Sequence, residues 1–205
     1  MFNLVLDKHP DTYQGFLIRT DFRIGIQVWA LLTHPDLDEG DKYYAVINLL
    51  FGKGAPQDAQ TILNCIKWYM SGGIWGTNKG DIEYIEYNDV DEEVQEKEAN
   101  LLEGDIAYDF ELDGALMESA FYHQYGIKLS ETKMHWFEFL ALFQGLKDTQ
   151  FNEVMGYRQM DLSQYPAKMR GKMRRIKEKY KIRKLSEARK KLLMKLYGDE
   201  WQKYI

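Results

Sequence analysis

Apolar residues recur along much of the chain at the spacing of an α-helix, with two or three polar positions between them. Residues that favour helix ends lie at the boundaries of these segments. Asp21 can cap the first helix and His34-Pro35 can stop it, while the glycine pair at 72–73 and the single Gly126 can end two others. Helices are therefore predicted over five stretches: 21–33, 38–51, 56–71, 109–125 and 130–146.

A short β-hairpin is predicted at the N-terminus. The apolar runs Phe2–Leu6 and Phe16–Thr20 have the character of strands, and the turn-prone sequence HPDTYQG lies between them. Elsewhere helices are favoured, because the 205 residues contain only 4 prolines. The predicted fold class is mainly α: a multi-helix bundle with a small N-terminal β-hairpin and a basic C-terminal helical extension.

The segment MHWFEFLALFQGL, Met134–Leu146, would form a helix with almost no polar side. At the helical period one broad face is predicted to be core, and it holds Trp136, Phe139, Leu140, Phe143 and Leu146. The opposite side holds Phe137, Ala141 and Gly145, and small residues at a spacing of four let another helix approach closely. Burying a ring such as Phe137 contributes about 1.5–3 kcal/mol. This helix is therefore predicted either to be sandwiched between neighbours or to leave its second face for a partner.

Residues 166–205 form a basic tail with an apolar row. The row recurs at helical spacing and consists of Met169, Met173, Ile176 and Tyr180. After a predicted break near Leu185-Ser186, leucines at 192, 193 and 196 continue it. Between these residues lies a predicted basic patch: Lys168, Arg170, Lys172, Arg174, Arg175, Lys177, Lys179, Lys181, Arg183 and Lys184. Taken with the previous helix, the candidate partner-binding residues are Trp136, Phe137, Ala141, Gly145, Met169, Met173, Ile176 and Tyr180.

Three roles are open for this tail. A basic amphipathic helix can dock on an acidic helix of another protein or of the same chain, and this role is weighted first. It can also be a plain solvated helix. Last, its cations can bind nucleic acid or an anionic membrane, although no nucleic-acid module accompanies them and the sequence pI is about 5.5.

Charge is distributed unevenly, and this asymmetry suggests a division of the chain. Residues 166–205 contain 15 Lys and Arg against 4 Asp and Glu, whereas residues 81–113 contain 14 acids and one lysine. Repulsion among carboxylates opposes compaction of the acidic segment. The predicted division is an N-terminal hairpin with helices (1–75), an acidic linker or arm (76–107) and a C-terminal helical region ending in the basic tail (108–205).

The remaining composition predicts a soluble, cytosolic protein. The single cysteine, Cys65, lies in an apolar helical pattern and is predicted to be a buried, unreactive thiol. The opening sequence MFNLVLDKHP has no basic start, so it does not resemble a signal peptide. No apolar window is long enough to span a bilayer.

Catalytic and metal-binding motifs are weak. His135 and Glu138 have the spacing of a metal-ligand pair on a helix, but no second pair completes a site, so no metal is predicted. The acids at 109, 111 and 113 are interpreted as favourable charges at a helix start. The sequence has neither a phosphate-binding glycine loop nor a nucleophile elbow. The chain is therefore predicted not to be an enzyme and to need no cofactor.

Five segments together resemble a known family. They are RTDFR (19–23), IKWYMSGG (66–73), YDFELDGALMESAFYHQYGIKL (108–129), HWFEFLALFQGL (135–146) and YRQMDLSQYP (157–166). These segments are similar to the gene-product-fifteen family of tailed bacteriophages and prophages of Gram-positive bacteria. The resemblance implies a tail assembly chaperone of long-tailed phages, which holds the tape measure protein during tail morphogenesis, and it supplies no catalytic residues.

From the resemblance and the residues together, the expected function is a non-enzymatic tail assembly chaperone in the host cytoplasm. Its expected partners are the tape measure protein or another tail protein, and it is expected to form a homo-oligomer. A membrane partner is not expected and nucleic acid is disfavoured. The first alternative is a structural virion component of the tail or connector, and the second is a nucleic-acid-binding accessory protein.

Overall fold

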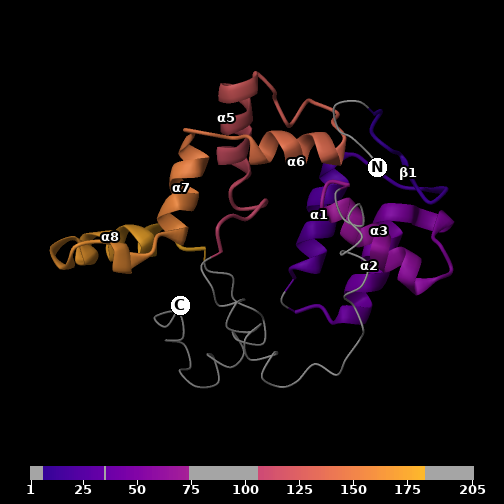
Figure 1. Cartoon of the computed structure of the whole chain (residues 1–205), viewed down its shortest axis with the longest axis horizontal. Helices are drawn as coiled ribbons and strands as arrows, with labels where there is room; N and C mark the ends of the chain where they lie inside the picture. Colours follow the sequence, from indigo (N-terminus) through magenta and orange to yellow (C-terminus); the bar gives the residue numbers. More distant parts are fainter. Residues whose placement is uncertain (1–6, 35, 74–105, 183–205) are drawn as a thin grey trace, which may run out of the picture. The chain divides into compact units, whose positions relative to one another are not determined.

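The computed structural model describes residues 7–34, 36–73 and 106–182 (Figure 1). The chain divides into two compact units, Met1–Glu86 with Ile127–Gly145 and Tyr87–Gly126 with Leu146–Ile205. The units alternate along the sequence, whereas the predicted division was consecutive. Most of the predicted acidic linker, and the predicted helix break near Leu185-Ser186, lie outside the described residues.

The first unit begins with a two-stranded antiparallel hairpin, β1 (Thr12–Tyr13) and β2 (Phe16–Leu17). Gln14 and Gly15 adopt positive φ angles of 48° and 87° and make the tight turn between the strands. The hairpin was predicted correctly, but its first strand lies in the stretch that was interpreted as the loop. The predicted strand Phe2–Leu6 falls outside the described residues.

Three helices follow the hairpin: α1 (Phe22–Leu32), α2 (Glu39–Phe51) and α3 (Ala59–Met70). An aspartate caps each of them, and its carboxylate accepts a hydrogen bond from a backbone N–H of the first turn. A short 3₁₀ turn, η1 (Gly52–Gly54), ends α2. The three helices confirm the predicted segments, although the third begins at its Asp58 cap rather than at Pro56.

The last helix of the first unit, α6 (Trp136–Gln144), completes its core. The predicted start near Ser130 was wrong, because 129–131 form a turn and the helix begins only after His135. Backbone hydrogen bonds fix this start, since Phe22 N donates to Met134 O at 3.0 Å and Trp136 N donates to Thr20 O at 2.7 Å. The segment before α1 and the segment before α6 are therefore tied together.

The second unit contains α5 (Gly114–Tyr125), α7 (Gln150–Gln159), the 3₁₀ turn η2 (Leu162–Gln164) and α8 (Ala167–Tyr180). Gly126 ends α5 with φ of 70°, as predicted for a left-handed C-cap. The sequence analysis missed α7. Its capping box uses Thr149 and Asn152, not the more recognisable Ser/Thr with Glu/Gln.

The described residues are mostly helical with one small N-terminal hairpin, so the predicted fold class is confirmed. No helix among these residues has the length and apolar character needed to cross a bilayer. Cys65 is a fully buried free cysteine, and its burial raises the pKa of the thiol to about 12. The prediction of a buried thiol is therefore confirmed.

Candidate interaction surface

Trp136, a predicted partner-binding residue, lies in the core of the first unit with only 1% of its surface exposed. Its indole packs directly on the backbone of α1 at Gly25, where a Cβ atom would overlap the ring. The indole N–H donates a hydrogen bond of 2.9 Å to the carbonyl of Tyr69 on α3. Trp136 thus joins three helices and is not available to a partner.

Phe137 is also buried, at 1% exposure, so it cannot contribute to an open surface on α6. Its ring meets Trp68 of α3 edge to face at 5.0 Å between centroids. Of the other two predicted members of this face, Ala141 is exposed and Gly145 is half-buried at the end of the helix. On the Phe137 side α6 therefore packs against α3, whereas Ala141 stays on the surface.

His135 caps α6 with its side chain. Its Nδ1 atom accepts a hydrogen bond of 3.1 Å from Phe137 N, and its Nε2 atom lies 3.1 Å from the carbonyl oxygen of Pro10. A ring that accepts at Nδ1 and donates at Nε2 is the neutral tautomer. Burial lowers the pKa of His135. The hydrogen bond to the Pro10 carbonyl opposes this effect, and the neighbouring His9 ring, 4.8 Å away between centroids, adds to it. The net effect of these surroundings is to favour the uncharged form of His135.

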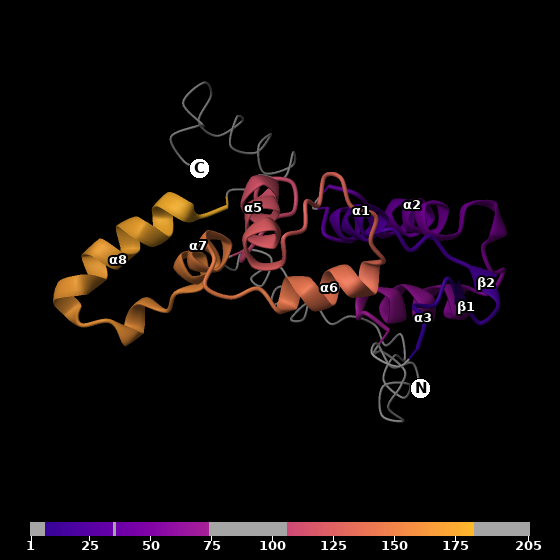
Figure 2. The same ribbon diagram turned by 90° about the horizontal axis from the view of Figure 1, so that it is seen from above.

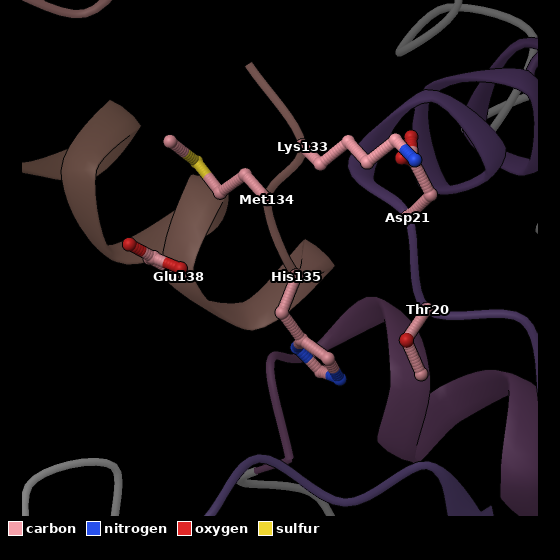
Figure 3. Close-up of a pocket in the computed structure, with 6 residues that line it drawn as sticks. All are labelled: Thr20, Asp21, Lys133, Met134, His135 and Glu138. Atoms are coloured by element: carbon pink, nitrogen blue, oxygen red, sulfur yellow. The ribbon is translucent and has the colours of Figure 1, made fainter.

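A shallow pocket of about 310 Å³ lies beside this cap. It is lined by Thr20, Asp21, Lys133, Met134, His135 and Glu138 (Figure 3). In Figure 3 the His135 ring and the Glu138 carboxylate point in different directions. They do not converge on a common point where an ion could bind both, and the His135 nitrogens are already engaged by backbone groups.

Arg23, within the RTDFR segment, has a structural role that the sequence did not reveal. Its guanidinium donates hydrogen bonds to three carbonyls of the turn before α6: Leu129 at 2.8 Å, Ser130 at 3.2 Å and Thr132 at 3.1 Å. These carbonyls have no helical partner because the turn is not helical. Arg23 therefore holds the 129–132 turn against the start of α1.

The second unit is organised around a buried ion pair between Arg158 on α7 and Asp113 at the start of α5. Arg158 Nη1 lies 2.6 Å from Asp113 Oδ2, and Nη2 donates to Oδ1 at 2.9 Å. The same guanidinium donates to Ala107 O at 3.1 Å and to Tyr180 O at 2.7 Å. Asp113 was predicted to favour the helix dipole, and it does sit at the N-cap position, but its carboxylate serves the ion pair.

α8 carries most of the predicted basic patch and half of the predicted partner-binding residues. None of its side chains is fully buried. Met169 is 44% exposed, and Met173, Ile176 and Tyr180 are half-buried. The cations on the helix are exposed except Lys177, which is half-buried; Lys181 just beyond it is exposed, and Arg183 and Lys184 lie outside the described residues. The structure thus brings the tail residues together on one helix of the second unit, whereas Trp136 and Phe137 belong to the first unit.

Both ends of α8 are anchored in its own unit. At the start, Arg170 Nε donates to Tyr165 O at 2.9 Å. Toward the end, Lys177 Nζ donates to Met160 O at 2.9 Å, and the Tyr180 ring stacks on Tyr157 of α7 at 5.2 Å. Figure 2 shows the end of α8 returning toward α7 while its start lies away from α5 and α7. A 14-residue helix is marginal in water on its own, so these anchors keep it formed.

These features define a helical protein with an exposed basic amphipathic helix. A sequence model of the Bacteriophage Gp15 protein family matches residues 10–182, and the chain belongs to this family. The resemblance seen in the sequence is therefore confirmed. Family membership points to a phage-associated structural or assembly protein. No curated protein and no solved structure matched the chain.

Proposed function

We propose that this protein is a phage tail assembly chaperone that binds the tape measure protein during tail morphogenesis in the host cytoplasm. It acts without catalysis, cofactor or metal, and as an oligomer. Family membership gives the phage context. The way in which the chain presents one of its helices supports the role of a binding protein.

The observation that supports this proposal is the state of α8. A helix with an apolar row normally buries that row against its own protein, because each buried side chain of this size contributes about 1.5–3 kcal/mol. On α8 the row from Met169 to Tyr180 is only half covered. Methionine suits a surface that adapts to different apolar partners, since its side chain is unbranched and polarizable.

Anchoring at both ends adds to this argument. A partner that binds a preformed helix loses less conformational entropy than one that must order it first. Arg158 and Arg170 hold α8 in place through backbone carbonyls at Tyr180 and Tyr165. The helix is thus presented ready-made to an elongated helical client.

Co-expression tests the proposal. The tape measure protein of the same phage is expected to be insoluble alone, and to become soluble and co-elute with this chain when the two are expressed together. The matched control is Met169→Asp with Ile176→Asp, which introduces charge into the apolar row. An insoluble tape measure protein in the presence of the wild-type chain contradicts the proposal.

Purified virions separate the chaperone from a structural tail or connector component. A chaperone is released before the tail is complete, so mass spectrometry of mature particles is expected to detect none of this chain. A structural component would be present at a fixed copy number per particle. That result would replace the proposed function with the structural one.

A further inference from the structure

The apolar row of α8 has the spacing of a coiled-coil seam. Met169, Met173, Ile176 and Tyr180 are separated by four, three and four residues. This is the d-a-d-a order of a heptad repeat, in which a and d face a partner helix. The helix spans Ala167–Tyr180, so the seam fills the two heptads available to it.

Every position that flanks this seam is basic. In the same register the e positions are Arg170 and Lys177, and the g positions are Lys172 and Lys179. These are the positions whose charges choose the partner of a coiled-coil helix. The only acid on the helix, Glu178, falls at an f position on the opposite side.

The chain's own second unit covers this seam only in part. α7 and η2 contact α8, and the Tyr157–Tyr180 stack lies at the end of the row. At the other end Met169 remains 44% exposed. The g-side cations Lys172 and Lys179 are exposed, whereas Lys177 on the e side is half-buried and bound to Met160 O. The g side of the seam is therefore the side that is more exposed to solvent.

We propose that α8 is the basic member of a heterotypic helix pair, and that its partner is an acidic helix with a matching apolar seam. This inference rests on the proposed function and assigns a chemistry to the client: the segment that α8 binds carries Glu or Asp at the positions flanking its own apolar row. The two seams pack together, and the carboxylates of the client lie against the g-side cations.

A second α8 helix is a poor partner for the same reason. Two helices with only Lys and Arg beside the seam bring like charges together, which disfavours self-pairing. A nucleic acid would use the cations but would leave the apolar row without a partner. The row and the charges together fit an acidic amphipathic helix.

Binding of two designed helical peptides to the full chain tests this inference. Both probes have the same leucine and isoleucine seam, and one has Glu at every flanking position while the other has Lys. Fluorescence anisotropy with labelled peptides is expected to show at least about tenfold tighter binding of the Glu probe, with a preference that shrinks as salt is added. Equal binding of the two probes overturns the inference.

Two charge-reversal variants with the same change in net charge separate the seam from the general charge of the helix. Lys172→Glu with Lys179→Glu alters the g positions and is expected to invert the preference toward the Lys probe. Arg174→Glu with Arg175→Glu alters positions away from the seam and is expected to keep the preference for the Glu probe. If both variants weaken Glu-probe binding equally, charge alone is responsible and the inference is wrong. Tighter binding of duplex DNA than of the Glu probe also overturns it.

Failure of this inference can be distinguished from failure of the proposed function. The g-position variant is also co-expressed with the tape measure protein. If the wild-type chain and the variant solubilise the tape measure protein equally well, the proposed chaperone function stands. In that case the inference about the cations that flank the α8 seam is wrong. Loss of solubilisation in the g-position variant but not in the Arg174/Arg175 variant supports the inference.

Discussion

Arg158 and Asp113 form a bidentate, buried ion pair that joins α7 to the start of α5, and the same arginine binds the last carbonyl of α8. One side chain therefore links the core of the second unit to the helix that we propose as the binding surface. Both partners are nearly inaccessible to solvent, with side-chain exposures of 9% and 4%. Each guanidinium nitrogen has at least one acceptor, which is the condition for a charge to be tolerated in a protein interior.

Removing one partner of this pair is expected to unfold the second unit readily. Arg158→Ala leaves the Asp113 carboxylate buried without its counter-charge, and the expected loss is about 3–5 kcal/mol in the free energy of unfolding. Chemical denaturation followed by circular dichroism measures it.

The control is Lys128→Ala, which breaks the exposed Lys128–Glu131 pair. Because exposed pairs contribute at most about 1 kcal/mol, this variant is expected to resemble the wild type. Similar stabilities for the two variants would show that the Arg158 pair does not hold the unit together.

Close packing of Trp136 on Gly25 makes a second prediction. Gly25→Ala places a methyl group where the indole lies, and overpacking of this kind costs about 1–3 kcal/mol. The matched control is Gly171→Ala on α8, where an added Cβ meets nothing within 4 Å. Alanine stabilises a helix by about 1 kcal/mol relative to glycine. This control is therefore expected to be at least as stable as the wild type. A stable Gly25→Ala variant would contradict the packing described for α6.

His135 predicts a pH dependence of stability. Burial lowers the pKa of His135 in the folded protein. As the pH falls below about 6.5, the unfolded chain therefore binds a proton at this residue more readily than the folded chain does. Stability from this residue is therefore present above that pH and is lost as the pH falls toward the lowered pKa. The hydrogen bond to the Pro10 carbonyl and, to a smaller extent, the charge of Asp11 oppose this lowering of the pKa, whereas His9 adds to it.

His135→Asn isolates this contribution, because asparagine can cap a helix but does not titrate in this range. Melting temperatures are measured for both proteins at about pH 7.5 and about pH 5.5. The wild type is expected to lose more stability on acidification than the variant. Equal losses would show that His135 does not resist protonation.

Cys65 predicts slow chemical modification. A fully buried thiol whose pKa is raised to about 12 is almost entirely protonated near neutral pH and unreactive. Iodoacetamide is expected to label it in denaturant but not in native buffer, as followed by mass spectrometry. Rapid labelling of the native chain would mean that the core around α3 opens readily.

Local patterns predicted the helices that have clear ends. Asp21, Asp38 and Gly126 act through their nearest backbone neighbours, so their roles follow from sequence alone. The start of α6 was wrong because Ser130 is a good cap by type, but its turn is held open by Arg23 from more than a hundred residues away. Such a long-range contact leaves no periodic signal.

For the same reason, the sequence could reveal features of the candidate site that lie within one helix, but not contacts between helices. The heptad-like row and the cations of α8 belong to one helix, so their spacing was visible in the sequence. Burial of Phe137 depends on Trp68 of a different helix, and a face that looks free on a helical wheel can be covered by such a neighbour. The pairing of Arg158 with Asp113 spans 45 residues and had no local pattern to reveal it.

The most direct test of the proposed function is site-specific photo-crosslinking in cells that produce phage. A photoreactive residue at Met169 on α8 is expected to form a covalent adduct with the tape measure protein, identified by mass spectrometry. The same residue at Tyr44, which is 68% exposed on α2 in the other unit, serves as the control and is expected to form none. Absence of a tape measure adduct at Met169, or equal adducts at both positions, would contradict the claim that α8 holds this client.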